Sequence, residues 1–207
     1  KKFSESGKQI IYVGHKNHDE AIGALGVAPE HMHLVESVDD IKNINFQDND
    51  VALLAQTTLA MSEWEPILDK VKEDFDNLDL PRKSDLCYAT TNRQKALINI
   101  SSNVDVVLVV GSSTSSNTKA LVTTIKNLGK EAYRIETLND LEDINLESKD
   151  VAITAGASAP EHIVNEISNF LNPKNFEYYI DTDEDEYFPL PKELRANISS
   201  LSRLLET

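Results

Sequence analysis

The sequence predicts an α/β protein that consists of two repeated parallel-sheet α/β modules and a C-terminal tail. The chain repeats itself, because residues 50–58 (DVALLAQTT) match residues 150–158 (DVAITAGAS), and residues 10–15 resemble residues 106–112. Each repeat is a continuous apolar run that ends in glycine or small hydroxyl residues before a helical pattern begins. Unbroken apolar strands that alternate with helices are typical of parallel sheets whose two faces are both covered.

The first module is expected to span residues 1–86. A strand at residues 10–14 precedes a helix that Gly26 closes, residues 39–41 begin a second helix, and a strand at residues 51–55 leads to a third. The third helix is expected to place an apolar face on the core. That face consists of Ile67, Leu68, Val71 and Phe75.

The second module is expected to span residues 87–172 and to repeat this order. A strand at residues 106–111 precedes a helix that Gly129 closes, residues 139–141 begin a short helix, and a strand at residues 151–155 follows. The crossovers between parallel strands should be right-handed. The last helix of the module should pack on the core through Ile163, Ile167, Phe170 and Leu171.

Residues 173–207 form the tail. Its acidic run at residues 181–186 is expected to be solvated, and Pro189 and Pro191 bracket an extended stretch. A final amphipathic helix is expected to dock on the body of the protein. Its apolar residues are Leu194, Ile198, Leu201, Leu204 and Leu205.

Charge and composition exclude several classes of function. Acidic residues outnumber basic residues by 35 to 20, a net charge of −15, which argues against nucleic-acid binding because phosphate contacts need clustered Lys and Arg. No apolar run approaches the roughly 20 residues of a membrane span, and no signal peptide is visible. The single cysteine, Cys87, excludes an internal disulfide and suits a reducing cytoplasm. Since the chain begins with Lys1 rather than Met, we expect a piece of a longer protein.

Polar loops follow the predicted strands at the edge where open parallel sheets bind ligands. These loops are residues 15–20, 56–58, 111–117 and 156–158, and the segment at residues 87–92 adds a fifth. Any one loop is more readily explained by helix capping, since Ser, Thr and Asn are ordinary N-caps. The convergence of all five on one edge predicts a binding site.

Residues 111–117 (GSSTSSN) carry the strongest phosphate signal. Gly111 allows close backbone approach, and the following helix offers free N–H groups at the positive end of its dipole. The hydroxyls and the Asn117 amide can bind phosphate oxygens, and Ser158 could complete the cradle. The loop is not a Walker motif, because it lacks the Gly-Lys-Ser/Thr ending.

Residues 15–20 (HKNHDE) place two imidazoles and a carboxylate close together, and three interpretations stay open. The segment is an exposed helix start, a proton-handling pair in which His18 binds an anion and Glu20 delivers protons, or part of a zinc site with no third neutral ligand nearby. Three interpretations also stay open for Cys87. It is a buried packing residue, a nucleophile, or one ligand of a metal site that is completed elsewhere.

Residues 87–94 (CYATTNRQ) resemble the third-cysteine segment of the LytB family, the 4-hydroxy-3-methylbut-2-enyl diphosphate reductases of the non-mevalonate isoprenoid pathway. Four further segments match the family's motifs in the same order, at residues 14–20, 56–59, 115–117 and 154–161. The tail at residues 188–195 is also similar.

The resemblance implies a trefoil of three α/β modules around a [4Fe-4S] cluster, of which this chain supplies the second and third. It also implies reductive dehydroxylation of an allylic diphosphate to isopentenyl and dimethylallyl diphosphates, with electrons from a donor such as ferredoxin or flavodoxin. Cys87 would ligate the cluster, Glu20 would supply protons, and Thr57 would orient the substrate hydroxyl. The diphosphate would be held by His18, Ser115, Ser116, Asn117 and Ser158, and supporting residues would be His15, Gln56, Thr90 and Asn92.

The chain departs from the family by lacking the first module, and with it two cluster cysteines and two phosphate-binding histidines. One thiolate cannot hold a cuboidal cluster, so the chain alone is expected to be inactive. Truncation, a natural short form and a separately encoded first module all stay open. The alternative functions are a cluster-free module that binds a diphosphate through residues 111–117 and Ser158, and a zinc hydrolase that uses His15, His18 and Glu20.

Overall fold

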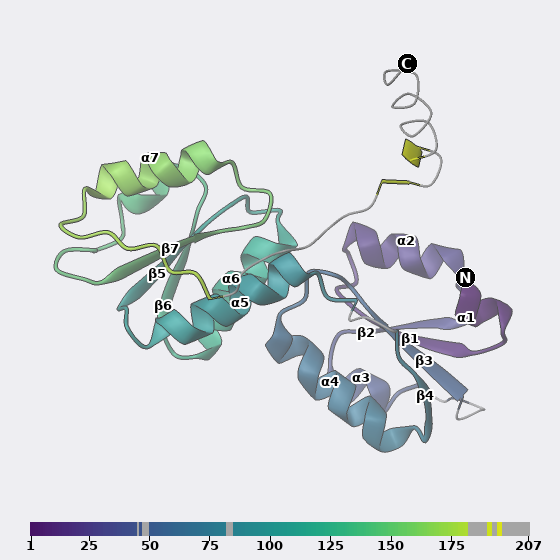
Figure 1. The fold of residues 1–207 in the computed structure, drawn as a ribbon. Helices are drawn as coiled ribbons and strands as arrows, with labels where there is room; N and C mark the ends of the chain where they lie inside the picture. Colours follow the sequence, from purple (N-terminus) through teal and green to yellow (C-terminus); the bar gives the residue numbers. More distant parts are fainter. Residues whose placement is uncertain (45, 47–49, 82–84, 182–189, 192–193, 196–207) are drawn as a thin grey trace, which may run out of the picture.

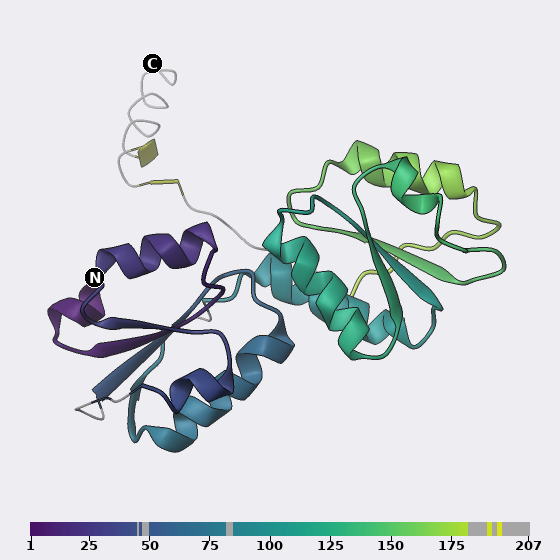
Figure 2. The same cartoon turned by 180° about the vertical axis from the view of Figure 1, so that it is seen from behind.

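The computed structural model contains two parallel-sheet α/β modules that lie side by side (Figures 1 and 2). It confirms the fold class that the repeated strands predict. The residues that it describes are 1–44, 46, 50–81, 85–181, 190–191 and 194–195. None of the helices in this described part combines the length and the apolar character that crossing a membrane requires.

The first sheet has the strand order β2–β1–β3–β4, and all neighbouring strands are parallel. Its strands are β1 (Gln9–Val13), β2 (Met32–Val35), β3 (Asp50–Ala55) and β4 (Asn77–Asp79). Val13 pairs with both Val35 and Ala55, so the three strands end at the same level. The loops after β1 and β3 therefore meet at one edge of the sheet.

Helices cover both faces of this sheet. They are α1 (Lys2–Glu5), α2 (Asp19–Val27), α3 (Val38–Ile41) and α4 (Met61–Asp74). α2 packs on one face through Ala21, and α3 and α4 pack on the other, where Ile67 and Val71 are buried. Leu68 and Phe75 pack against the same core, which confirms the predicted apolar face of α4.

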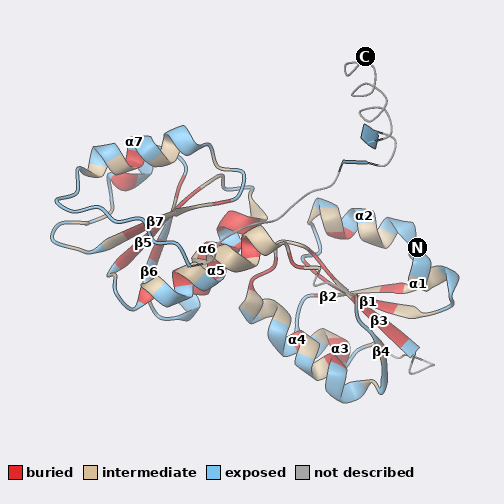
Figure 3. Cartoon of the chain, in the orientation of Figure 1, coloured by how far each residue is buried: buried red, intermediate tan, exposed pale blue. Residues whose placement is uncertain are grey.

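The second sheet has the order β6–β5–β7, again parallel. Its strands are β5 (Val106–Val110), β6 (Glu131–Ile135) and β7 (Val151–Ala155). Its helices are α5 (Tyr88–Ser101), α6 (Ser116–Asn127), the 3₁₀ helix η1 (Leu138–Leu141) and α7 (Glu161–Leu171). α5 and α6 cover one face, and η1 and α7 cover the other. Figure 3 shows the buried residues concentrated in the strands and in the facing sides of these helices.

The repeat is visible in the helix caps. Asp40 accepts hydrogen bonds from the backbone and hydroxyl of Ser37 ahead of α3, and Asp140 accepts the backbone N–H of Thr137 ahead of η1. The Glu36 N–H, which donates to Asp40 at 3.0 Å, is the main cause that lowers the pKa of Asp40, and the Thr137 N–H is the main cause that lowers the pKa of Asp140. The polar starts predicted at residues 39–41 and 139–141 are thus confirmed as equivalent capping boxes.

Two details of the predicted elements are wrong. Gly26 does not close its helix, since α2 continues to Val27 and Gly26 lacks a positive φ, whereas Gly129 has φ 74° just beyond α6. Phe170 is 60% exposed, although Ile163, Ile167 and Leu171 pack on the core as predicted. Val164 completes the buried stripe of α7, which leaves Phe170 at the margin of that stripe.

The tail is described only in part. Residues 173–181 are exposed, and the Asn99 side chain donates a hydrogen bond of 2.6 Å to Asp181. Residues 182–186 of the acidic run, Pro189 and most of the predicted last helix, from Ile198 onward, lie outside the described residues.

Candidate functional site

Glu20 and Thr57 meet at the carboxyl edge of the first sheet. Glu20 lies in the first turn of α2, and Thr57 follows β3. The Thr57 N–H donates to both Glu20 carboxylate oxygens at 3.1 and 3.2 Å, and the Thr57 hydroxyl donates to Oε2 at 3.1 Å. Both residues are half-buried. The pair is therefore a carboxyl group joined to a hydroxyl at a partly exposed sheet edge, an arrangement that can transfer a proton.

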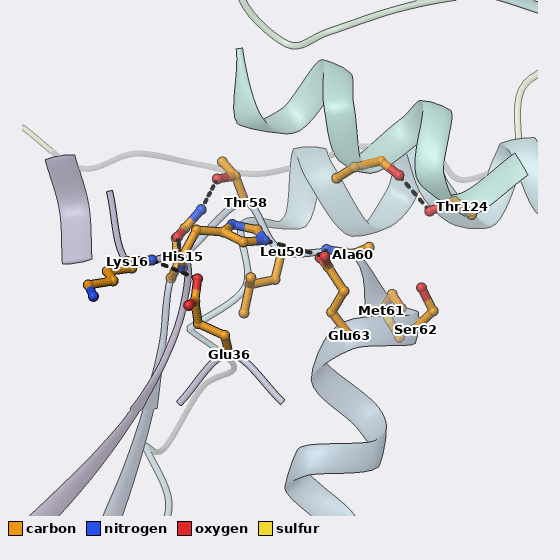
Figure 4. Close-up of polar contacts among 12 residues, drawn as sticks. His15, Lys16, Glu36, Thr58, Leu59, Ala60, Met61, Ser62, Glu63 and Thr124 are labelled. Atoms are coloured by element: carbon orange, nitrogen blue, oxygen red, sulfur yellow. Dashed lines mark hydrogen bonds and ion pairs between the residues drawn. The ribbon is translucent and has the colours of Figure 1, made fainter. Parts of the chain in front are cut away.

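His15 and Glu63 face each other across the loop that precedes α4 (Figure 4). His15 Nε2 lies 3.3 Å from Glu63 Oε1, while Glu63 Oε2 accepts the Ala60 N–H that opens α4. The hydrogen bond with Glu63 raises the pKa of His15, and the same bond lowers the pKa of Glu63. The buried Gln56 side chain accepts the His15 N–H at 3.0 Å, so both predicted supporting residues organise this loop.

His18 is the N-cap of α2, and its Nδ1 accepts the Glu20 N–H at 3.2 Å. His15, His18 and Glu20, the residues considered for zinc, thus have separate partners. Within the described ranges, no three or more His, Cys, Asp and Glu side chains gather where they could hold a metal ion. The geometry favours the capping and proton-handling interpretations of this segment over a zinc site.

Cys87 lies at the N-cap of α5, next to the Glu20–Thr57 pair. Its N–H donates to the Thr57 carbonyl at 2.8 Å, and its side chain is half-buried with a free thiol. A partly accessible thiol at a helix N-terminus fits one ligand position of an iron–sulfur cluster, which needs three or four. The described residues provide one thiolate ligand. They therefore fit one coordination position of such a cluster and not its complete ligand set.

Tyr12 and Asp85 lie behind this edge. The Tyr12 side chain is buried, its hydroxyl has no hydrogen-bond partner, and burial together with the charges of Glu20 and Asp85 raises its pKa. Burial also raises the pKa of Asp85, whose carboxylate accepts the Ala55 N–H at 3.0 Å. Glu20 and Cys87 therefore lie near two titratable side chains, Tyr12 and Asp85, that are partly removed from water.

A second cluster forms at the N-terminus of α6. Ser115 is the N-cap, and its hydroxyl accepts the Thr118 N–H at 3.2 Å, while Ser116 opens the helix half-buried. Asn117 is only 6% exposed, and neither of its amide atoms has a hydrogen-bond partner. An unpaired amide at this depth is costly, and the Asn117 amide at a helix N-terminus is chemically able to bind a polar ligand.

Two glycines bring the strand ends of the second sheet against this helix. A Cβ at Gly111 would lie 2.3 Å from Thr118 Oγ1, and a Cβ at Gly156 would lie 2.4 Å from the same atom. Gly156 also lies beside Ser115, since its Cβ would be 3.7 Å from the Ser115 hydroxyl. The loops at residues 111–117 and 156–158 are therefore adjacent, and Ser158 is exposed in the second of them.

The motif at residues 87–94 joins the two modules. Thr90 is buried and Asn92 is half-buried in α5. Gln94, fully buried, accepts the Met61 N–H at 2.8 Å and donates to the Leu59 carbonyl at 3.0 Å. An α5 side chain thus binds the backbone where α4 of the first module begins, which places the start of α4 beside the second turn of α5.

A cavity of about 410 Å³ lies elsewhere, between η1 and α7. None of the predicted site residues lines it. Its walls are Glu136, Thr137, Leu138, Asn139, His162, Ile163, Glu166 and Ile167. The candidate site is the pair of polar clusters at the sheet edges, not this cavity.

Sequence reasoning missed Thr118, Gln94 and Asp85. Gln94 closes the motif CYATTNRQ, and its place in that motif was the available signal. Asp85 gives no local signal because its partner, the Ala55 N–H, lies 30 residues away. Thr118 gives none because only the folded structure brings Gly111 and Gly156 against it.

Comparison with known proteins agrees with this geometry. The family model described as LytB protein matches residues 1–172. The 4-hydroxy-3-methylbut-2-enyl diphosphate reductase of Yersinia pestis is 37% identical over 206 residues, which is 96% of this chain and 65% of the relative. The reductase of the same name from Rhodopirellula baltica is 39% identical over 201 residues, 94% of this chain and 63% of the relative.

A solved structure of E-1-hydroxy-2-methyl-but-2-enyl-4-diphosphate reductase from Plasmodium falciparum superposes with a TM-score of 0.82 at 33% identity. The match covers 96% of this chain and 65% of that structure. The chain thus spans less than two thirds of the length of these relatives. From its motifs, its fold and the match over residues 1–172, the chain belongs to the LytB family.

Proposed function

We propose that this chain is the second and third modules of a 4-hydroxy-3-methylbut-2-enyl diphosphate reductase. The observation that carries the proposal is the Glu20–Thr57–Cys87 arrangement, in which the Thr57 N–H and hydroxyl donate to the Glu20 carboxylate and the Thr57 carbonyl accepts the Cys87 backbone N–H. The module boundaries that we propose are residues 1–86, 87–172 and the tail at 173–207.

Glu20 and Thr57 would handle protons. The reaction takes two electrons and two protons, removes the substrate hydroxyl as water, and gives isopentenyl and dimethylallyl diphosphates. The Thr57 hydroxyl oxygen lies 3.1 Å from Glu20 Oε2. With Glu20 protonated, its carboxyl would donate to Thr57 Oγ1, and the Thr57 hydroxyl would pass its own proton to the departing hydroxyl. Gln56 and His15 hold the neighbouring loop in place.

The cluster at α6 would hold the diphosphate. The Asn117 amide and the hydroxyls of Ser115, Ser116 and Ser158 offer neutral donors at a helix N-terminus, and His18 would reach the same anion from the first module. Neutral donors suit a chain with a net charge of −15, because they bind phosphate without needing a basic surface. Thr90 and Asn92 would support the part of the pocket that lies between the Glu20–Thr57 pair and the polar cluster at the start of α6.

Cys87 would be one thiolate ligand of a [4Fe-4S] cluster, and the other ligands would come from outside the described residues. When bound, the cluster supplies electrons that it receives from a donor such as ferredoxin or flavodoxin. The chain alone would lack turnover, since one thiolate does not retain a cluster. A lone free cysteine suits a reducing compartment, and we place the activity in the cytoplasm.

The test is turnover of the complete protein, reconstituted anaerobically with iron and sulfide and supplied with a chemical reductant and the hydroxylated diphosphate. We expect visible charge-transfer absorption and formation of both products. Absence of bound iron after reconstitution, or of turnover in a loaded protein, would contradict the assignment.

Asn117→Asp tests the phosphate cradle separately. The new carboxylate would repel the diphosphate in a buried setting, so we expect kcat/KM to fall at least about a hundredfold. Asn127→Asp is the matched control, because Asn127 is exposed at the other end of α6. Full turnover in Asn117→Asp would show that the phosphate lies elsewhere.

A cluster-free diphosphate-binding module is the second candidate, favoured by the unpaired Asn117 amide, which lies wholly within this chain. Calorimetric titration of the 207-residue chain with isopentenyl diphosphate distinguishes the two. Saturable binding without iron would support the binding module, and no heat at millimolar ligand would exclude it.

A further inference from the structure

The end of β3 lacks a strand partner on one side. β4 pairs only with residues 50–52 of β3, so among the described residues the backbone from Leu53 onward has no neighbouring strand there. The Gln56 N–H bonds to Val13 on the β1 side, and the Ala55 N–H therefore points to the opposite, unpaired side.

The segment that precedes α5 takes the place of the missing strand. The Asp85 carboxylate accepts the Ala55 N–H at 3.0 Å, and the Cys87 N–H donates to the Thr57 carbonyl at 2.8 Å. Between them, Leu86 is 7% exposed and packs in the core of the first module. Residues 85–87 thus lie beside the end of β3 like a short added strand.

We propose that Asp85 is a positioning residue that holds Cys87 in register with the Glu20–Thr57 pair. Ala55 is only 5% exposed, so its N–H needs an acceptor, and the Asp85 carboxylate provides it two residues before the thiol. Glu20 binds Thr57 from the other side of β3, and the acid and the thiol are therefore placed by one strand end. That this placement of Cys87 serves catalysis rests on the proposed function, whereas the placement itself does not.

The register is tested on the 207-residue chain by the rate at which a maleimide alkylates Cys87 at fixed pH. Asp85→Ala removes the acceptor and should raise the rate about tenfold or more by freeing the segment. Asp85→Asn keeps an acceptor oxygen for Ala55 and should restore a rate within about twofold of the parent. Equal rates in the parent and in Asp85→Ala would overturn the proposal.

Asp105→Ala is the matched control. Asp105 also accepts a backbone N–H, that of Asp150 at 2.9 Å, but it does so at the start of β7 in the second module. Asp105→Ala should leave the Cys87 alkylation rate unchanged. If it raises the rate as much as Asp85→Ala does, the rate reports a general loss of stability, and the specific role of Asp85 is refuted.

If Asp85→Ala does not fold, hydrogen exchange at the Ala55 and Cys87 amides of the parent chain provides the test instead. The Ala55 and Cys87 amides should be protected to a similar degree, because one opening of the segment exposes both. Strong protection at Cys87 with none at Ala55 would overturn the proposal.

In the complete, loaded enzyme, Asp85→Ala should lower kcat with little change in KM, and Asp85→Asn should recover most of the loss. If Asp85→Ala changes the alkylation rate but not kcat, Asp85 positions Cys87, and this positioning does not contribute to catalysis. A protein that fails the turnover test altogether would refute the proposed function and leave the alkylation result intact.

Discussion

Glu63 serves two partners at once. One carboxylate oxygen caps the first turn of α4 through the Ala60 N–H, and the other binds His15 Nε2. In the sequence, Glu63 stands shortly before the predicted apolar face of its helix, where a capping carboxylate is common. Its second partner was not predictable, because it depends on how the loop after β1 crosses toward α4.

The His15–Glu63 pair predicts a window of pH in which the fold is best stabilised. The folded pKa of His15 lies above 6.5, so its contribution is full below 6.5 and is lost as pH rises through the raised value. The folded pKa of Glu63 lies below 4.5, so its contribution is present above 4.5 and is lost as pH falls through the lowered value. The pair therefore contributes fully between 4.5 and 6.5.

Urea unfolding of the parent and of His15→Ala at about pH 5.5 and about pH 8 checks this window. The stability difference between the two should be larger at the lower pH, by less than about 1 kcal/mol because the pair is partly exposed. A difference that grows at the higher pH would contradict the assignment.

At the scale of elements, α6 fits the strand ends of the second sheet only because two glycines face Thr118. Gly156→Ala would place a methyl group 2.4 Å from Thr118 Oγ1, so either the buried Thr118 side chain or α6 itself must shift. We expect a loss of about 1–3 kcal/mol in unfolding free energy, partly restored by adding Thr118→Ala.

Chemical unfolding with a double-mutant cycle measures this effect. Gly23→Ala is the control, since Gly23 lies in α2 with nothing within 4 Å of its Cβ position. That change should stabilise the chain by about 0.5–1 kcal/mol, as expected for Gly in a helix. A neutral Gly156→Ala would show that the contact with Thr118 is not tight.

The strands were the most predictable elements. Val106–Val110 is an unbroken β-branched and apolar run, and all five residues are buried in β5. β4 was missed because Asn77-Leu78-Asp79 is short and polar, and it is a strand only through its pairing with β3. Such edge strands are set by tertiary contacts rather than by their own residues.

At the scale of the whole molecule, Gln94 determines how the modules meet. Its amide satisfies the Met61 N–H and the Leu59 carbonyl, because a neutral amide both accepts and donates hydrogen bonds. The repeat in the sequence predicted two modules, but not their contact, because one amide inside a polar helix start carries no periodic signal.

Gln94→Ala should cost about 2–4 kcal/mol, because it leaves a void and two unpaired backbone groups. Calorimetric unfolding should also become less cooperative as the modules uncouple. Asn127→Ala is the control, since Asn127 makes an exposed hydrogen bond to Ser62 across the same junction and should cost less than about 0.5 kcal/mol. Equal losses in both variants would refute the role of Gln94.

The Thr57–Cys87 backbone hydrogen bond has a consequence for motion. Because Thr57 also binds Glu20, two hydrogen bonds connect Cys87, the first residue of the second proposed module, to the carboxyl group of the first. The acid–sulfur spacing is therefore kept only while the modules stay in contact through these bonds and those of Gln94, so we expect product to leave without separation of the two modules.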